Sequence, residues 1–505
     1  MNIKNLLKTI FVVAGIIPAV SLSAQEGLEK YRQEQKAALS KYAQEKRTEL
    51  KNYRDSINRE YAKYLEESWK SFDLQQQERR FEPMSAPPVY EPEKPQPSET
   101  PKPVNVTPVK PVPPTEKPKP EVKPKPEIKP KPEVKPIPAT PEYPVAAEFF
   151  GTAVRLQTFQ TKPYRMSGIS EKEVAGYWRF LSGLPCGKLT DDMLRIKKEL
   201  KLNDWAMYML ANSLFKTFFP NGSENEQVVF SMFIFNQLGY RAKIGRTDGE
   251  LLALIAFKNK LSNTSFFTFE QNGKDVKYSV LNPNHRELSS LQTCGSEYGN
   301  DGKLADVNIT QIPDFNSEID VKQITYQNRG YNFEYSRNLV DFYATYPCVD
   351  FSVYADAPLD EPVLKSLQTE LKPQIEGKSQ EEAVNFILHF VQNAFEYKND
   401  DAQFGYEKWN FAEETLVSSF SDCDDRAVFF TQLVKNLLGM KAVLVYYPKR
   451  HLAAAVKFDS PDTQGDYVTL DGVKYLICDP TYRNANLGKA MPKLRNIAFE
   501  IIRLK

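Results

Sequence analysis

Residues 421–439 read SDCDDRAVFFTQLVKNLLG and place one cysteine, Cys423, among three aspartates immediately before an apolar helical run. A structural cysteine belongs within an apolar face, and a metal-binding cysteine has another Cys or His close by in the sequence. Cys423 has neither. Asp422 stands where a helix N-cap is expected, so Cys423 takes the first helical position, and Asp424 and Asp425 complete the first turn.

The start of a helix suits a reactive sulfur. Its N–H groups are unpaired and its dipole is positive there, which favours a thiolate and stabilises an oxyanion. The neighbouring aspartates oppose the thiolate, so a cationic partner is needed, and imidazolium is the usual one. The chain has three histidines. His389 lies within a predicted helix and His285 within a predicted loop, whereas His451 opens the predicted buried strand HLAAAVKF.

A carboxylate follows the next predicted strand. The apolar run of GVKYLICDPTY, residues 472–482, ends at Asp479, whose carboxylate can orient the imidazole of His451. The order along the chain is Cys, His, Asp with equal spacing, which places the last two groups on neighbouring strands. The structural alternatives are an inert thiol at Cys423, a packed core histidine, and a turn carboxylate before Pro480.

Residues 221–244 repeat this pattern earlier in the chain. NGSENEQVVFSMFIFNQLGYRAKI aligns without a gap on residues 421–444, with identical Val, Phe, Asn, Leu, Gly and Ala at six positions. A second match aligns VKYSVLNP, residues 276–283, on VKYLICDP, residues 473–480. Because both matches occur in the same order, we predict that the chain holds two copies of one fold.

The first copy lacks the chemistry of the second. Ser223 takes the position of the cysteine, Asn282 that of the carboxylate and, with one gap, Glu250 that of the imidazole. Without an adjacent imidazole, a serine hydroxyl is not an effective nucleophile near neutral pH. We therefore expect the first copy to be catalytically inactive. It binds substrate, supports the second copy or serves only as structure.

Several motifs of the second copy recur together in one known superfamily. They are KWNFAEETL, SDCDDRAVFFTQLVKNLLG, HLAAAVKF and CDPTY, with NANLGKAMP near the end of the chain. As a set they resemble the transglutaminase-like superfamily, a branch of the papain-like folds, in its exported bacterial members. The resemblance implies that Cys423 is the nucleophile, His451 the general base and acid, and Asp479 the orienting carboxylate. One departure is Ser421, where the family usually has Gly.

The resemblance also implies two auxiliary roles. In some relatives an upstream aromatic residue shields the thiolate or lines the cleft, and Trp409 has that place here; a buried core tryptophan is the alternative. Acidic residues that flank the cysteine bind calcium in some bacterial relatives, and Asp422 and Asp424 occupy those positions. The cysteine chemistry itself requires no cofactor.

The N-terminal segment, from Met1 to Ala24, has the features of a secretory signal peptide. Lysines precede an apolar stretch from Thr9 to Val20, and small residues follow up to Ala24. The apolar stretch is shorter than the roughly 20 residues that span a bilayer, and so are the later ones. We expect an exported protein, periplasmic or extracellular. The remaining cysteines are then disulfide candidates with three alternative pairings; they are Cys186, Cys294, Cys348 and Cys478.

A polar segment with a period of eleven residues follows the signal peptide. Eleven residues make about three helical turns, so the repeated positions form a nearly straight apolar stripe on a charged helix. The stripe consists of Tyr31, Leu39, Tyr42, Leu50, Tyr53, Tyr61, Tyr64 and Phe72. It predicts self-association, as in a coiled coil, or docking on another surface. The alternative is a solvated stalk stabilised by charge pairs.

A proline-rich segment separates this helix from the remainder of the chain. Residues 83–144 hold 22 of the 36 prolines, including the repeat KPKPEVKPKPEIKPKPEVKP. Proline fixes φ and removes N–H donors, so we expect an extended linker with a reach on the order of 180 Å. It resembles the spacers of bacterial envelope proteins, which implies association with the cell envelope; a plain tether is favoured over a binding role. The net charge of +1 gives no reason to expect nucleic acid as a partner.

The predicted fold class is α+β, with two transglutaminase-like domains of which the first is degenerate. The expected function is that of a cysteine peptidase or amidase, an exported hydrolase that cleaves peptide or isopeptide amides through a thioester. The alternatives are a protein-crosslinking transglutaminase and a non-enzymatic envelope scaffold. The expected divisions are a signal peptide (1–24), a helix (25–82), a linker (83–145), a degenerate domain (146–305), a β-rich connection (306–360) and a catalytic domain (361–505).

Overall fold

The computed structural model describes residues 22–77, 81, 86–91, 143–157, 164–271, 273–299 and 302–505. Nearly all of the expected signal peptide and most of the expected linker lie outside the described residues. The protein is a mixed α and β structure with a long N-terminal helix and several sheets. Among the described residues, no helix combines the length and the apolar content that crossing a membrane requires.

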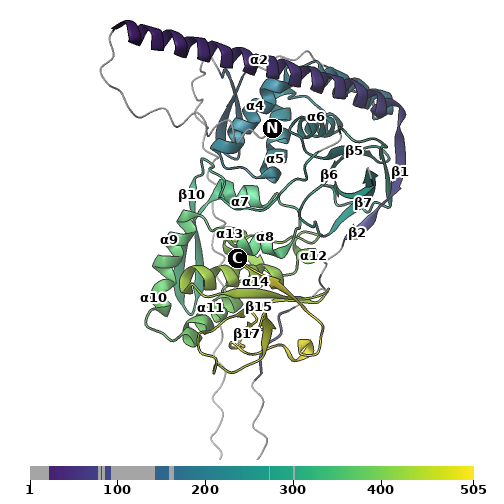
Figure 1. The fold of residues 1–505 in the computed structure, drawn as a ribbon. Helices are drawn as coiled ribbons and strands as arrows, with labels where there is room; N and C mark the ends of the chain where they lie inside the picture. The colour runs from purple at the N-terminus through teal and green to yellow at the C-terminus, as the bar shows by residue number, and fades with distance from the viewer. Residues whose placement is uncertain are drawn as a thin grey trace, which may run out of the picture.

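The helices fall into an N-terminal and a C-terminal group, both shown in Figure 1. The first group is α2 (Leu22–Glu67), α3 (Glu171–Ser182), α4 (Cys186–Glu199), α5 (Asp204–Phe218) and α6 (Glu224–Gln237). The second is α7 (Arg337–Tyr343), α8 (Phe351–Asp356), α9 (Glu361–Glu370), α10 (Lys372–Ile375), α11 (Gln380–Ala394), α12 (Asp400–Gln403), α13 (Ala412–Val417) and α14 (Cys423–Leu433), with η1 (Val434–Leu438) and η2 (Pro492–Leu494).

The strands form one large sheet in each half of the chain and three short ladders. The N-terminal half holds β1 (Trp69–Asp73), β2 (Gln75–Gln77), β3 (Val145–Phe149), β4 (Thr152–Leu156), β5 (Ala242–Arg246), β6 (Leu251–Ile255), β7 (Thr264–Gln271), β8 (Lys274–Leu281) and β9 (Ser290–Cys294). The rest are β10 (Ile319–Tyr326), β11 (Arg329–Ser336), β12 (Glu396–Tyr397), β13 (Phe420–Ser421), β14 (Ala442–Tyr447), β15 (His451–Val456), β16 (Tyr467–Leu470), β17 (Val473–Cys478) and β18 (Glu500–Arg503).

The N-terminal helix is shorter than expected. It ends at Glu67, and the residues up to Gln77 form β1 and β2 instead of continuing the helix to residue 82. Phe72, a predicted stripe position, therefore lies on a strand, where it packs against Phe267 and Phe269. The eleven-residue pattern did not predict that the helix ends at Glu67, because Phe72 still falls at a repeat position. The residues that hold Phe72 on a strand belong to β7, which is distant in the sequence.

The first large sheet closes on itself. Its strand order is β1-β9-β5-β6-β8-β7-β2, so β1 and β2 lie at opposite edges although a single residue, Leu74, separates them in sequence. The two edges must therefore meet, and the chain between helix and linker seals a barrel-like sheet. Residues of β6 and β8 join Phe267 in an interior cluster, and α6 packs against β6 and β5.

The second large sheet has the order β16-β17-β15-β14-β18. Helix α14 packs on one face, against β15 and β14. The other face forms a separate apolar cluster with the segment that follows β17, including Tyr482, Met491 and Leu494. Because both faces are covered, β15 is buried along its whole length and reads as a continuous apolar run.

The two sheets share one topology. A helix is followed by strands in the order β5, β6, β7, β8, β9 in the first unit and β14, β15, β16, β17, β18 in the second, and corresponding strands are neighbours in both sheets. The registers correspond as well: Ala253 pairs with Leu281, and Ala454 pairs with Cys478. Leu281 and Cys478 are the residues that the sequence alignment matches.

The segment 306–360 was expected to be a small antiparallel region. Alternating apolar and polar residues in VKQITY, YNFEYS and VDFSVYA predict three strands, and the first two correspond to β10 and β11, which form a hairpin. The third, VDFSVYA, was wrong as a strand, because Phe351–Asp356 form α8. Its alternation of apolar and polar residues is short, and α8 is buried against α14, which overrides the local β propensity of Val and Tyr.

All five cysteines are buried and free, so the described structure contains no disulfide bond. Burial raises the pKa of Cys186 and of Cys348 to about 12. These thiols are therefore protonated and inert core side chains in this structure.

Candidate functional site

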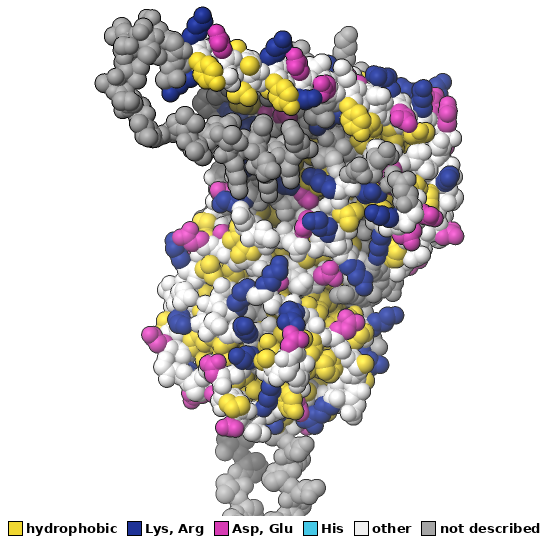
Figure 2. All heavy atoms as spheres, viewed as in Figure 1, with side chains coloured by type: hydrophobic (Ala, Val, Ile, Leu, Met, Phe, Trp, Pro, Cys, Tyr) yellow, Lys and Arg dark blue, Asp and Glu magenta, His cyan; other side chains and the backbone are white. Residues whose placement is uncertain are grey.

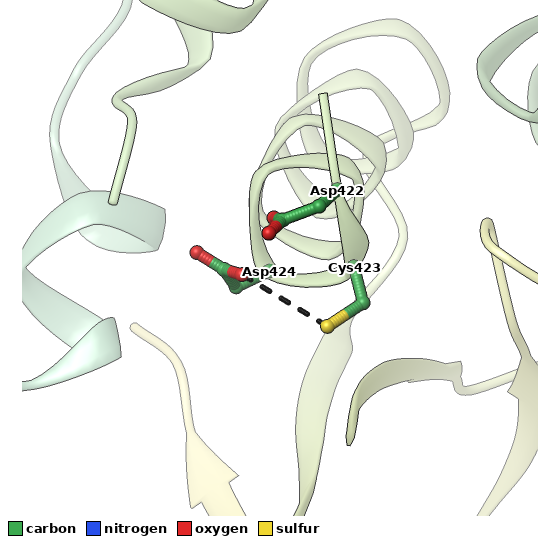
Figure 3. Close-up of side chains that lie close together, drawn as sticks. All are labelled: Asp422, Cys423 and Asp424. Atoms are coloured by element: carbon green, nitrogen blue, oxygen red, sulfur yellow. Dashed lines mark hydrogen bonds between the residues drawn. The ribbon is translucent and has the colours of Figure 1, made fainter. Parts of the chain in front are cut away.

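Cys423 begins α14, as the sequence predicts. Asp422 occupies the N-cap position, although its side chain makes no capping hydrogen bond. The Cys423 side chain is buried, and its thiol lies 3.9 Å from Oδ1 of Asp424. Figure 3 shows the sulfur directed toward Asp424, with the carboxyl groups of Asp422 and Asp424 close together at the helix start. The backbone amide of Leu452 also donates toward this sulfur.

His451 and Asp479 form a buried pair. His451 is the first residue of β15, and Asp479 directly follows β17, which pairs with β15 in antiparallel register. Nε2 of His451 lies 2.9 Å from Oδ2 of Asp479. The other carboxyl oxygen, Oδ1, accepts hydrogen bonds from the N–H groups of Thr481 and Tyr482 at 2.9 and 3.2 Å. Asp479 is therefore held from two sides, and one ring nitrogen of His451 is engaged.

The three predicted residues converge on one end of the second sheet. The sulfur of Cys423 contacts the amide of Leu452, the neighbour of His451 along β15. Within the described part of the chain, no hydrogen bond joins this sulfur to the imidazole, and Nδ1 of His451 is buried without a partner. The structure thus forms the His–Asp pair, and it places the thiol at the amide of Leu452, turned toward Asp424.

The surroundings of Cys423 favour the neutral thiol. Burial and, after it, the negative charge of Asp422 raise the pKa of this thiol well above its usual value near 9, and the Leu452 amide only partly opposes them. The expected effect of the helix start on the thiolate is therefore outweighed here. The sulfur is protonated at neutral pH in this closed arrangement.

Four buried carboxyl groups surround the helix start. They belong to Asp400, Asp422, Asp424 and Asp425. Burial, followed by the negative charges of Asp422 and Asp425, raises the pKa of Asp400 to about 10. Burial and the charge of Asp422 likewise raise the pKa of Asp424 well above its ordinary range. Carboxylates this close together cannot all ionise without a compensating cation, so some of them hold protons here.

The carboxyl cluster fits the cation that the family resemblance implies. Oδ1 of Asp422 and Oδ2 of Asp424 are buried and have no hydrogen-bond partner among the described residues. Single ligand atoms of Asp422, Cys423 and Asp424 lie within 4.8 Å of one another, as do those of Asp400, Asp422 and Asp425. Carboxylate oxygens are the ligands that calcium prefers. Bound there, calcium would supply positive charge beside the sulfur and favour its thiolate.

Arg426, which the sequence analysis did not single out, holds the helix start in place. Arg426 is buried, and its Nε donates to Oγ of Ser421 at 3.0 Å, while its Nη2 donates to the carbonyl of Phe395 at 2.9 Å. Ser421 therefore serves as an acceptor for a buried guanidinium. No pattern in the sequence indicates this contact, because Phe395 lies 31 residues upstream of Arg426.

Trp409 is buried in the same apolar cluster as Cys423. Its ring stacks on Phe351 at a centroid distance of 4.0 Å. Asp425 fixes the adjoining loop, because its Oδ1 and Oδ2 accept from the backbone N–H and side-chain Nδ2 of Asn410 at 3.0 and 2.9 Å. The loop that carries Trp409 is thus tied to the first turn of α14.

The corresponding positions of the first unit make structural contacts. Oγ of Ser223 accepts from the N–H of Glu226 in a capping box at the start of α6. Glu250 forms an ion pair with Arg286 at 3.1 Å, and Asn282 donates to the carbonyl of Arg286 at 2.7 Å. The hydroxyl that replaces the sulfur is therefore used as a helix cap.

Comparisons with known proteins add little to this geometry. No protein-family model and no curated protein matches the chain. Among solved structures it is similar to one described as a "putative protease" from Parabacteroides distasonis ATCC 8503, at 13% sequence identity and a TM-score of 0.16, over 50% of this chain and 62% of that chain. The chain thus spans about three fifths of that structure's length.

Proposed function

We propose that the protein is an exported cysteine hydrolase, a peptidase or amidase of transglutaminase-like fold. Cys423 is the nucleophile, His451 the general base and acid, and Asp479 the carboxylate that orients the imidazole. The two sheets of common topology are two copies of this fold, of which the first has lost its site. The single observation that supports the assignment best is the buried His451–Asp479 pair beside a helix that begins with cysteine.

The proposed reaction uses the ring nitrogen that the pair leaves open. Because Nε2 of His451 is engaged with Asp479, Nδ1 is the nitrogen that can accept a proton. The Cys423 side chain turns from Asp424 toward Nδ1 and transfers its proton there. The sulfur then attacks the amide carbonyl, and the oxyanion is stabilised by free N–H groups at the helix start.

The remaining steps return the enzyme to its starting state. The protonated imidazole gives its proton to the amine, the C–N bond breaks, and a thioester remains on Cys423. Water attacks the thioester and loses a proton to Nδ1, the C–S bond breaks, and the proton returns to the sulfur. The products are an amine and a carboxylic acid. An amine in place of water would instead give a crosslink.

A peptide-library digest tests the proposal. The wild-type protein is expected to cleave a subset of peptides, and Cys423→Ala to cleave none. Cys186→Ala is the matched control, because it removes a buried thiol from α4 in the first unit. A fluorescent primary amine in the same reactions distinguishes hydrolysis from transfer. Incorporation of the amine without cleavage would replace the hydrolase with a transglutaminase.

A non-enzymatic scaffold is the second candidate, and the exposed stripe of α2 favours it. Tyr31, Leu39, Tyr42 and Tyr53 are 56 to 62% exposed, whereas Tyr61 on the same stripe is buried against α3. Figure 2 shows hydrophobic side chains along this helix at the surface. We propose that a second copy of the chain covers them. Sedimentation that shows a monomer at all concentrations would exclude this role.

A further inference from the structure

Residues 86–91 form an isolated parallel β-bridge with the segment that follows β17. The N–H of Tyr90 donates to the carbonyl of Arg483 at 2.8 Å, and the N–H of Arg483 donates to the carbonyl of Pro88 at 2.9 Å. Val89 thus pairs with Arg483 in parallel. The ring of Tyr90 packs edge-on against Tyr482 at 5.8 Å. This is the geometry by which an extended peptide binds to the free edge of a sheet or loop.

The edge that accepts this strand is fixed to the His–Asp pair. Tyr482 and Arg483 follow Asp479 closely in the sequence. Oδ1 of Asp479 holds the N–H of Tyr482, while Oδ2 contacts Nε2 of His451. A peptide on this edge is therefore positioned by the same carboxyl group that positions the imidazole.

Phe81 lies in the apolar cluster that also contains Cys423 and Leu452. Its ring packs against Phe351 at 6.1 Å and Tyr446 at 5.9 Å. Tyr446 on β14 pairs with Leu452, whose amide faces the Cys423 sulfur. In the order of the sheet, β15 with its histidine lies between β14 and β17. Phe81 contacts β14, and Val89 contacts the segment that follows β17, so the two flank the strand that carries the imidazole.

We propose that Phe81 and residues 86–91 occupy the peptide-binding subsites of the candidate active site, so that the chain blocks itself. The substrate is an extended peptide that pairs in parallel with Arg483 and places an aromatic side chain against Tyr482. The claim that the substrate is an extended peptide rests on the proposed function. The claim that Phe81 and residues 86–91 cover the site does not. The burial of both Cys423 and His451 agrees with a blocked site.

Tethering explains why such a weak contact keeps the site covered. Two backbone hydrogen bonds and one ring contact would bind a free hexapeptide poorly, but a linked segment acts at an effective concentration of about 1 mM or more. A substrate in solution must compete with it. Release of the segment, by cleavage or by a partner, would uncover the site.

Alkylation of Cys423 in the full-length protein tests the occupancy without requiring catalysis. Tyr90→Pro removes the N–H that donates to the carbonyl of Arg483. Val89→Pro removes an N–H for which the described residues show no acceptor. We expect iodoacetamide to label Cys423 about tenfold faster in Tyr90→Pro than in Val89→Pro or the wild type. Labelling of Cys186, followed by mass mapping, reports any general unfolding.

A second pair of variants tests the aromatic subsite. Phe81→Ala is expected to accelerate labelling of Cys423, whereas Phe72→Ala, which removes the same ring from the first sheet, is not. A synthetic peptide with the sequence APPVYE is then added to Cys423→Ala proteins. It should bind Tyr90→Pro and not the Val89→Pro control.

The outcomes separate this proposal from the proposed function. Equal labelling of Cys423 in the wild type, Tyr90→Pro and Phe81→Ala, with Cys186 protected, overturns the occupancy. Faster labelling without binding of the peptide overturns the assignment of the edge as a peptide subsite. Faster labelling and peptide binding, without cleavage of any library peptide, support the covering of the site by this segment. The same result contradicts the proposed hydrolase function.

Discussion

One carboxyl group, that of Asp479, holds both His451 and Tyr482. Its Oδ2 lies 2.9 Å from Nε2 of the histidine, and its Oδ1 lies 3.2 Å from the N–H of Tyr482. The orientation of the imidazole and the position of the edge beside it are therefore coupled. Substitution of this residue should affect stability as well as catalysis.

Asp479→Ala is expected to lower the free energy of unfolding by about 3 kcal/mol, because it leaves buried N–H groups without an acceptor. Asp479→Asn keeps an acceptor for Thr481 and should cost less. Both variants should lose at least about 100-fold in kcat/KM, because the imidazole is no longer held by a carboxylate. Chemical denaturation and peptide hydrolysis measure the two effects. Equal stability of both variants and the wild type would contradict the coupling.

The thiol of Cys423 is expected to titrate far above neutral pH in the native protein. Burial and Asp422 raise its pKa, so alkylation should be slow at pH 7 and accelerate as the pH rises beyond 9. Asp422→Asn removes the nearest negative charge and should move the midpoint to lower pH. The exposed Asp462→Asn is the matched control. The prediction fails if the midpoint of the native protein lies near that of a free cysteine.

Asp400 is expected to make the protein less stable as the pH rises. Burial and the charges of Asp422 and Asp425 raise the pKa of this carboxyl group to about 10 in the folded chain, whereas it is about 4 in an unfolded one. Between these values the folded chain binds a proton that the unfolded chain has lost. The free energy of unfolding should therefore fall with increasing pH, by up to about 1.4 kcal/mol per pH unit for this group.

Asp400→Asn should flatten that slope and stabilise the protein at pH 8. The amide oxygen can still accept the hydrogen bond that the N–H of Lys408 donates at 2.7 Å. Asp401→Asn changes the adjacent residue and should leave the slope unchanged. Urea denaturation between pH 5 and pH 9 measures both. A slope that Asp400→Asn does not alter would show that other groups determine the pH dependence.

Calcium should replace the protons of the carboxyl cluster. At a concentration 100 times its dissociation constant, a ligand that binds only the folded chain adds about 2.7 kcal/mol to the free energy of unfolding. We expect millimolar calcium to raise the melting temperature at pH 8, and Asp424→Asn to abolish the shift. Magnesium at equal concentration is the control for ionic strength. An unchanged melting temperature in calcium would show that the carboxyl cluster does not bind calcium.

The stripe on α2 should contribute to stability only where it is covered. Tyr61 is buried against Trp178 and Tyr298, at centroid distances of 5.0 and 5.4 Å, so Tyr61→Ala should cost about 3 to 5 kcal/mol. Tyr53 is 62% exposed at an equivalent stripe position, and Tyr53→Ala should change the free energy of unfolding by less than about 0.5 kcal/mol. Similar losses in dilute solution would mean that another surface covers Tyr53.

The sequence by itself determined the local features of the site. A cysteine after an N-cap aspartate, a histidine at the start of a buried strand and an aspartate directly after another apolar strand all lie where the sequence predicts. Caps, strand ends and apolar runs are properties of short segments. The alignment of residues 221–283 with residues 421–480 also predicted strands that correspond in the two sheets, since register follows the apolar pattern.

Only the tertiary structure decided what surrounds those residues. Asp400 joins the carboxyl cluster, and Phe81 packs against Tyr446, which pairs with Leu452. Both contacts join residues that are distant in the chain. Such contacts follow from how the helices and sheets pack, and no local pattern encodes them. The state of the thiol is decided in the same way, because burial and neighbouring charge fix a pKa, and both arise only when the chain has folded.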